Sequence, residues 1–77
     1  MMARDQIIAA DRFRRALLAL QTAGWAGPGE RVRADIRAAA LEAVETYQAF
    51  TATGLVADAA DSRLVLQARQ YLVKGKA

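Results

Sequence analysis

Residues 30–53, ERVRADIRAAALEAVETYQAFTAT, decide the fold, because their apolar positions recur with the period of an α-helix. At about 100° of turn per residue, one broad stripe gathers most of the large apolar side chains and several alanines. This stripe consists of Val32, Ile36, Ala39, Ala40, Ala43, Tyr47 and Phe50. Charged residues such as Asp35, Glu42 and Glu45 occupy the opposite side. The stretch therefore predicts a long amphipathic helix whose apolar face is covered by the rest of the chain.

The limits of this helix are indicated by residues that favour helix ends. Pro28 suits a first turn, where its missing N–H has no partner in any case, and the acidic Glu30 faces the positive end of the helix dipole. Gly54 easily adopts the left-handed conformation that closes a helix. We therefore expect a helix over residues 29–53.

Two further helices are predicted, one on each side of this stretch. The first covers residues 5–23, with Asp5 as its N-cap and Gly24 as its stop. The other covers residues 58–74, with Asp58 as its N-cap and Asp61 in its first turn. The apolar stripes are Ala9, Ala10, Phe13, Ala16, Leu17 and Leu20 in the first helix, and Ala60, Leu64, Val65, Ala68, Tyr71 and Leu72 in the last.

The connections at 24–29 and 54–57 are short and contain glycine, so consecutive helices are expected to be antiparallel neighbours. The chain is thus predicted to be one all-α domain of 77 residues, a small antiparallel three-helix bundle with a frayed tail at 75–77. A single core of this size supplies only about 3–5 kcal/mol. Association as a homodimer would add stability, and we expect it.

Trp25 is the one bulky residue in the connection at 24–29, and it has two interpretations. Large aromatic side chains dominate core energetics, which favours Trp25 as a plug at the open end of the bundle. Tryptophan is also enriched at binding hot spots, so the alternative is an anchor at an interface.

Every predicted helix carries apolar residues outside its core stripe. These are Ile7 and Leu18 in the first helix, Leu41 beside Val44 in the middle one, and Leu66 and Val73 in the last. Single exposed leucines are ordinary, and a monomer in which each helix meets two neighbours would cover some of these positions. The alternative is an interface with another chain. The residues predicted for an oligomer interface are Ile7, Leu18, Leu66, Val73 and Trp25.

The net charge of +3 comes from the first half of the chain. Residues 1–40 hold seven arginines and four acidic residues, a difference of +3, whereas the four basic and four acidic residues of 41–77 cancel. Arg33 and Arg37 lie one turn apart beside Leu41, on an edge with no obvious internal partner, and Arg12 and Arg15 form a similar pair. Either these arginines form a solvated rim that pairs with nearby acids, or their planar groups bind a partner with an acidic surface.

The composition argues against catalysis and metal binding. Histidine and cysteine are both absent, which removes the commonest acid–base, nucleophilic and metal-ligating side chains. Glu42 and Glu45 stand one turn apart, but no Glu-x-x-His motif accompanies them. The glycines of 24–29 lack the lysine of a phosphate-binding loop. We expect no enzymatic activity, no cofactor and no metal.

Membrane insertion is not expected either. No apolar run approaches the roughly 20 residues of a spanning helix, and the first five residues lack the pattern of a signal peptide. The expected location is cytoplasmic.

Together these features predict a non-enzymatic binding protein that acts through a helical protein–protein interface. In size and composition, though not in any motif, the chain is comparable with small phage-encoded inhibitors of the anti-CRISPR type and with assembly adaptors. The alternative is a nucleic-acid-associated regulator that contacts phosphates through its arginine-rich edge. A helix-turn-helix around Gly54 would present Asp58 and Asp61 where a recognition helix meets DNA, so nucleic acid is ranked second.

Overall fold

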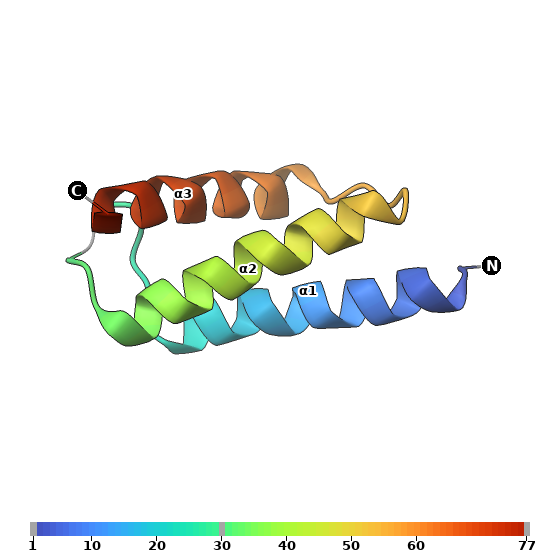
Figure 1. The fold of residues 1–77 in the computed structure, drawn as a ribbon, viewed down its shortest axis with the longest axis horizontal. Coiled ribbons are helices and arrows are strands. Elements are labelled where there is room, and N and C mark those ends of the chain that lie inside the picture. The colour runs from blue at the N-terminus through green and yellow to red at the C-terminus, as the bar shows by residue number, and fades with distance from the viewer. Residues whose placement is uncertain (1, 30, 77) are drawn as a thin grey trace.

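Three α-helices make up the regular structure of residues 2–29 and 31–76, which are the residues that the computed structural model describes. They are α1 (Arg4–Thr22), α2 (Ala34–Ala52) and α3 (Ala59–Lys76). Consecutive helices run antiparallel, and α2 crosses between α1 and α3 (Figure 1). The predicted all-α three-helix architecture is confirmed.

Helix α2 is the central element, because it packs against both other helices. Among the described residues, α1 and α3 make no close backbone contact with each other. The result is an elongated molecule, 41 × 19 × 18 Å, in which the two outer helices are held by the middle one. This arrangement leaves side chains of α1 and α3 to line a common groove, which is described below.

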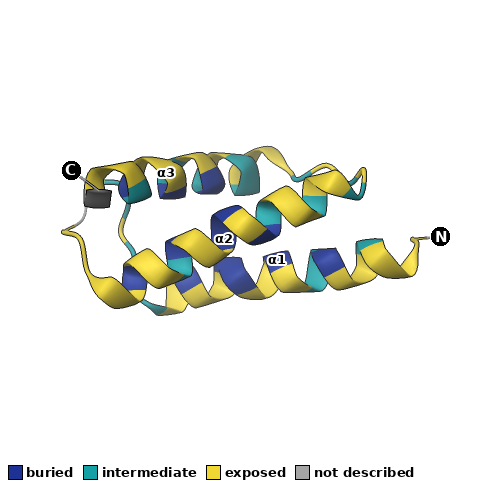
Figure 2. Cartoon of the chain, viewed as in Figure 1, coloured by how far each residue is buried: buried dark blue, intermediate teal, exposed yellow. Residues whose placement is uncertain are grey.

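The core follows the predicted stripes closely (Figure 2). In α1 the buried residues are Ala9, Phe13, Ala16, Leu17 and Leu20. In α2, Ile36 of the first turn and Ala40 and Ala43 of the middle have no exposed surface, and in α3 the same holds for Ala68 and Tyr71. Alanines at the middle of α2 let the backbones of both neighbours come close, because a methyl group fills the little space between packed helices.

Val44 is a correction to the predicted core. The sequence places it beside Leu41 on a second, outer apolar line, but it is buried, whereas Leu41 is exposed. Because α2 is covered on both sides, its buried face is broader than a single stripe. Val32 and Ala60 belong to the predicted core stripes but are exposed, since Val32 precedes the helix and Ala60 lies in the first turn of α3.

The start of α2 is the largest error in the predicted helices. The helix begins at Ala34 rather than near residue 29, and Arg33 is its N-cap, with extended backbone angles of φ −129° and ψ 146°. Pro28 and Gly29 form a turn instead of a first helical turn. The predicted role of Glu30 at the helix start lies outside the described residues.

A tertiary contact explains why residues 31–33 are not helical. The Tyr71 hydroxyl of α3 accepts a hydrogen bond from the Arg33 backbone N–H at 2.9 Å and donates one to the Arg31 carbonyl at 3.0 Å. A helical segment here would direct these groups to partners within α2. Sequence periodicity carries no information about such a partner, which lies 38 to 40 residues away along the chain.

The other helix ends agree better with the sequence. Gly24 and Gly54 follow α1 and α2 with positive φ of 80° and 91°, which is the backbone conformation expected of glycine stops. Asp58 caps α3 as predicted, because its Oδ1 accepts the Asp61 backbone N–H at 2.8 Å.

The outermost residues differ slightly from the predicted limits. Helix α1 has Ala3, not Asp5, at its N-cap, and the Gln6 side chain accepts the Ala3 backbone N–H at 3.0 Å. Helix α3 continues to Lys76, two residues beyond the predicted end, and Ala77 of the predicted tail lies outside the described residues.

Candidate interaction surfaces

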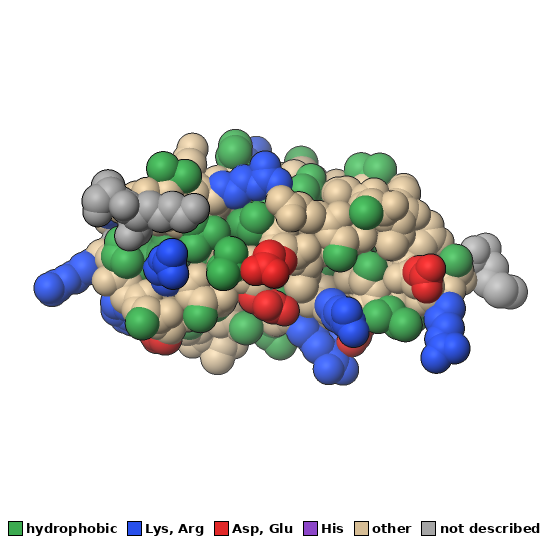
Figure 3. Space-filling model, viewed as in Figure 1, with side chains coloured by type: hydrophobic (Ala, Val, Ile, Leu, Met, Phe, Trp, Pro, Cys, Tyr) green, Lys and Arg blue, Asp and Glu red, His purple; other side chains and the backbone are tan. Residues whose placement is uncertain are grey.

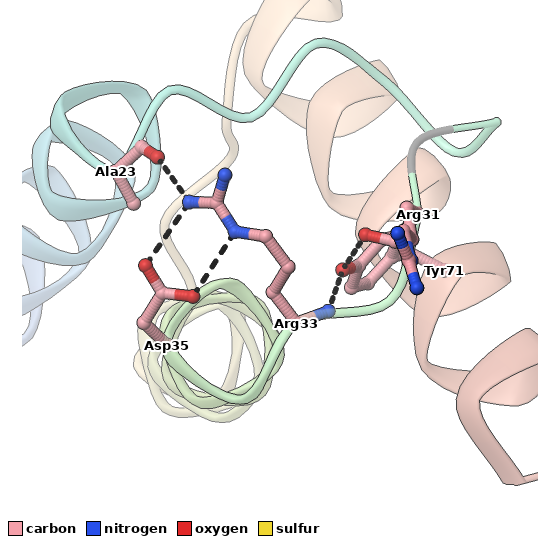
Figure 4. A network of polar contacts seen from close by, with 5 residues as sticks. All are labelled: Ala23, Arg31, Arg33, Asp35 and Tyr71. Atoms are coloured by element: carbon pink, nitrogen blue, oxygen red, sulfur yellow. Dashed lines mark hydrogen bonds and ion pairs between the residues drawn. The ribbon is translucent and has the colours of Figure 1, made fainter.

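Arg33 links the end of α1 to the start of α2 (Figure 4). Its guanidinium donates to the Ala23 carbonyl, at the end of α1, at 3.1 Å. It also binds the Asp35 carboxylate through Nε at 3.3 Å and Nη2 at 3.1 Å. The hydrogen bond from Arg33 first, and that from the Ile36 backbone second, lower the pKa of Asp35 below its ordinary value. The side chain of Arg33 is therefore engaged within the chain.

The predicted edge of Arg33, Arg37 and Leu41 is only partly available for a partner. The expectation that this edge lacks an internal partner is wrong for Arg33, whose guanidinium is held by Asp35 and Ala23. Arg37 and Leu41 are exposed on α2, and no ion pair of Arg37 occurs within the described part of the chain. Of the three predicted edge residues, Arg37 and Leu41 remain available for a partner.

Arg12 and Arg15, the second predicted arginine pair, belong to α1 and lie on the side of α1 that faces α2. Arg15 and Arg14 both bind Asp11, at 3.0 and 2.8 Å, and the Arg14 hydrogen bond is the main reason that the pKa of Asp11 is lowered. Arg12 and Arg15 line a shallow groove together with two acids of α2, Glu42 and Glu45. This side of the molecule therefore has a mixed charge rather than a basic one. The face shown in Figure 3 likewise carries acidic side chains among basic ones.

The structure places four of the predicted oligomer-interface residues on the surface. Ile7 and Leu18 of α1 and Leu66 and Val73 of α3 are all more than half exposed. Leu66 and Val73 are seven residues apart and share one face of α3, and Ile7 and Leu18, eleven residues apart, share one face of α1, because both separations are close to whole numbers of helical turns. Each outer helix therefore exposes a pair of apolar side chains on one face, two turns apart in α3 and three turns apart in α1.

Trp25, the fifth predicted interface residue, packs at the end of the core. Its ring meets Tyr71 edge-on, with 6.1 Å between centroids and 78° between planes. The side chain is half-buried against the core cluster, and its Nε1 is buried without an acceptor among the described residues. Trp25 therefore covers the Tyr71 ring at this end of the molecule.

A groove between α1 and α3, called here the α1–α3 groove, was not anticipated from the sequence. It has a volume of about 610 Å³, and its lining includes the apolar residues Phe13, Leu17 and Phe50. The Phe13 and Phe50 rings lie 5.0 Å apart between centroids. Leu18 of α1 and Val56, from the turn before α3, also line it. The one sequence signal is Val56, a branched apolar residue in a turn, which is 89% exposed.

The wall of this groove at the start of α3 is acidic. Asp58 and Asp61 both line it, and among the described residues no lysine or arginine forms an ion pair with either. Burial, and secondly the nearby negative charge of Asp58, raise the pKa of the Asp61 carboxyl above its ordinary value. The groove thus combines an apolar lining with two aspartates that have no ion pair among the described residues, and Arg14, which binds Asp11, also lines it.

The raised pKa of Asp61 predicts a specific pH dependence of stability. A carboxyl that binds its proton more tightly when folded contributes stability below its unfolded pKa, and this contribution is lost as pH rises through the folded pKa. We expect the free energy of unfolding of the wild type, relative to that of Asp61→Asn, to be higher at about pH 3 than at about pH 7. Urea unfolding of both proteins at the two pH values measures this difference. If the free energy of unfolding of the wild type relative to Asp61→Asn is constant or increases between about pH 3 and pH 7, the pKa of Asp61 is not raised in the folded chain.

Metal-binding and membrane-spanning features were also sought within residues 2–29 and 31–76. Groups of three or more acidic side chains that could hold a metal ion do not occur there. Glu42 and Glu45, the acidic pair one turn apart, are both exposed. In the same residues, none of the helices has the length and apolar character needed to cross a membrane.

Comparisons of the chain with protein-family models, curated proteins and solved structures gave no significant match.

Proposed function

We propose that this chain is a non-enzymatic binding protein that assembles as a homodimer and acts on another protein through a helical surface, as small inhibitors and assembly adaptors do. The observation that supports this is the exposure of large apolar side chains outside a closed core. Leu66 and Val73 on α3 are 56% and 70% exposed, although Val65, Ala68 and Tyr71 of the same helix are buried. Apolar surface arranged along one helix is typical of interaction sites.

The partner surface that we propose is the edge of Arg37 and Leu41, with the arginines of α1 as a second contact. Arg37 is exposed and has no ion pair among the described residues, so it is available for a carboxylate of an acidic protein. Leu41, one turn further along α2, supplies an apolar contact beside it. Arg12 and Arg15 are exposed, although Arg15 already binds Asp11.

Assembly is tested by replacing the exposed apolar residues of α3. The double variant Leu66→Glu with Val73→Glu is expected to be a folded monomer, because both positions face solvent in the isolated chain but carry the proposed interface. Light scattering coupled to size exclusion measures the mass, and far-UV circular dichroism measures the helix content.

The matched control adds the same two charges on the outer face of α2, as Ala38→Glu with Ala52→Glu. This control is expected to remain dimeric. If the α3 double variant keeps the mass of the wild type, the outer face of α3 is not the interface.

The alternative function, a nucleic-acid-associated regulator, has some support from the exposed arginines. Arg12 and Arg37 have no ion pair within the described residues and are available for phosphates. Against it, Glu42 and Glu45 line the groove that Arg12 and Arg15 share, and their charge would repel a phosphate backbone. Titration with duplex and single-stranded oligonucleotides at low salt, where phosphate contacts are strongest, separates the two functions. The proposed function predicts no binding.

A further inference from the structure

No local cap fixes the start of α2. The N-cap residue is Arg33, and its side chain makes no capping hydrogen bond. Arginine is not one of the residue types that cap helices through their side chains. The two residues before it, Arg31 and Val32, are compatible with a helix, and Val32 stands four residues before the buried Ile36. The local sequence therefore allows α2 to begin one turn before Ala34.

Two side chains of α3 occupy backbone groups that such an earlier start would need. In a helix that began one turn earlier, the Arg33 N–H would bond to the Gly29 carbonyl. Instead, the Tyr71 hydroxyl accepts this N–H at 2.9 Å (Figure 4), and the Lys74 Nζ donates to the Gly29 carbonyl at 3.3 Å. The Tyr71 hydroxyl also donates at 3.0 Å to the Arg31 carbonyl, which a helix would direct to an N–H four residues further on. One stretch of α3 therefore holds the segment before α2 out of the helix.

The same conformation keeps the Arg33 side chain away from the predicted edge of α2. Its guanidinium binds the Ala23 carbonyl at 3.1 Å and the Asp35 carboxylate at 3.1 Å. Side chains two residues apart do not face each other on a helix, so the contact with Asp35 depends on the position of Arg33 before the first turn. Within a helix, Arg33 would stand four residues before Arg37 and eight before Leu41, and all three would lie within about 80° on one face.

We propose that α3 controls the partner-binding edge of α2. When Tyr71 and Lys74 release the segment before α2, this segment becomes the first turn of that helix. Arg33 then joins Arg37 and Leu41 on one face. We call the present arrangement the closed form and the lengthened helix the open form. This inference rests on the proposed function, in which the edge binds an acidic protein, and it adds Arg33 as the third residue of that edge.

The partner that the open form fits is a helix with acidic side chains on successive turns. Arg33 and Arg37 would present two planar guanidinium groups one turn apart, and each can bind a carboxylate through two parallel hydrogen bonds. Leu41 would follow one turn later as the apolar contact. The closed form offers this partner one of the two arginines, so it binds the same surface more weakly.

The connection between α1 and α2 is long enough for the open form. Residues 23–33 connect these helices, and transfer of 31–33 to α2 shortens the connection from eleven residues to eight. Connections of about 2–8 residues are usual between packed helices. Gly27, at φ 137°, and Gly29 lie in the part that remains, and glycine adopts new backbone angles at little steric cost. The change of form is therefore confined to this connection and the start of α2.

Removal of both α3 contacts tests the change of form. The variant Tyr71→Phe with Lys74→Met keeps the aromatic ring and the aliphatic stem but lacks the hydroxyl and the amine. We expect the ratio of open to closed form to rise about tenfold or more, because three hydrogen bonds of the closed form are lost. The Cα chemical shifts of residues 31–33, measured by NMR, then move towards helical values, while those of α3 stay helical.

Two further variants serve as controls. Tyr47→Phe removes the hydroxyl of the other tyrosine, which forms no hydrogen bond among the described residues, and should leave the shifts of residues 31–33 unchanged. Addition of Val32→Gly to the double variant disfavours the new helical turn, because glycine is a poor helix former. It should return the shifts of Arg31 and Arg33 towards their wild-type values.

The effect on binding is measured with a short oligoglutamate peptide at low salt, where contacts between exposed charges are strongest. We expect the double variant to bind this peptide about tenfold more tightly than the wild type, in proportion to the gain in the open form. Addition of Arg33→Gln to the double variant should remove the gain. Addition of Arg12→Gln, which removes a charge of α1 outside this edge, should leave the gain unchanged.

The outcomes separate this inference from the proposed function. If the shifts of residues 31–33 keep their wild-type values while α3 of the double variant is folded, the segment is not a latent turn of α2 and the inference is overturned. It is also overturned if the turn forms but the peptide binds no more tightly, or if Arg33→Gln leaves the gain intact. If Arg37→Gln leaves binding of the peptide to the wild type unchanged, the proposed partner edge itself is wrong.

Discussion

Replacement of Tyr71 by alanine is expected to leave most of the chain unfolded at room temperature. Tyr71 is among the largest side chains without exposed surface, and its ring meets Trp25 at the end of the core. Removing a buried aromatic side chain costs about 3–5 kcal/mol, which is as much as a single core of this size supplies. The loss of both hydrogen bonds to residues 31–33 adds to this cost. Far-UV circular dichroism and urea unfolding measure the effect.

Tyr71→Phe is the control that separates packing from hydrogen bonding. The phenylalanine ring keeps the contact with Trp25 but leaves the Arg33 N–H and the Arg31 carbonyl without the hydroxyl. Since each hydrogen bond contributes about 0.5–1.5 kcal/mol, this variant should remain folded with a lower midpoint of unfolding. If Tyr71→Ala were as stable as Tyr71→Phe, the ring would not belong to the core.

The second large effect is expected from Ala40→Leu in the middle of α2. Ala40 has no exposed surface, and α2 packs against helices on both sides, so the added carbon atoms have no space to enter. Overpacking of a core typically costs about 1–3 kcal/mol, occasionally more, which is a large part of the stability available here. The free energy of unfolding in urea is the measurement.

Ala38→Leu is the matched control, because it makes the same substitution two residues earlier on the exposed side of α2. Leucine and alanine are both good helix formers, so this variant should unfold within about 0.5 kcal/mol of the wild type. Equal destabilisation at the two positions would mean that α2 is not the central helix.

Much of this architecture could be predicted because local chemistry determines it. The stripe from Ala9 to Leu20 has the period of a helix, and glycine at 24 and 54 supplies the backbone conformation that ends one. Asp58 caps α3 through an interaction confined to one turn. These features depend on residues close together in the chain, so the sequence pattern is sufficient to find them.

The errors arise where distant residues decide the local structure. Residues 31–33 have helical periodicity, but they lie outside α2, and the Tyr71 hydroxyl binds their backbone at Arg31 and Arg33. The burial of Val44 could not be predicted, because periodicity shows one stripe and cannot show that α2 has a neighbour on each side. The contact of Arg33 with the Ala23 carbonyl was missed because that carbonyl belongs to the end of the preceding helix, whereas pairing of the arginines with nearby acids was one of the two interpretations of the sequence.

The candidate surfaces also divide into features set by residues close together in the chain, which could be predicted, and features set by distant residues, which could not. Exposure of Leu66 and Val73 could be predicted from their place on α3, since it depends on one helix. The α1–α3 groove could not, because its lining comes from all three helices and the turn before α3. The acidic wall depends on this groove too, since Asp58 and Asp61 line it without an ion pair among the described residues.

Sedimentation equilibrium of the wild-type chain over a range of concentrations tests the proposed homodimer most directly. We expect the average mass to approach twice the 8.3 kDa of one chain at tens of micromolar and to fall towards 8.3 kDa on dilution. A mass of 8.3 kDa at every concentration up to about 50 µM would contradict assembly through α3.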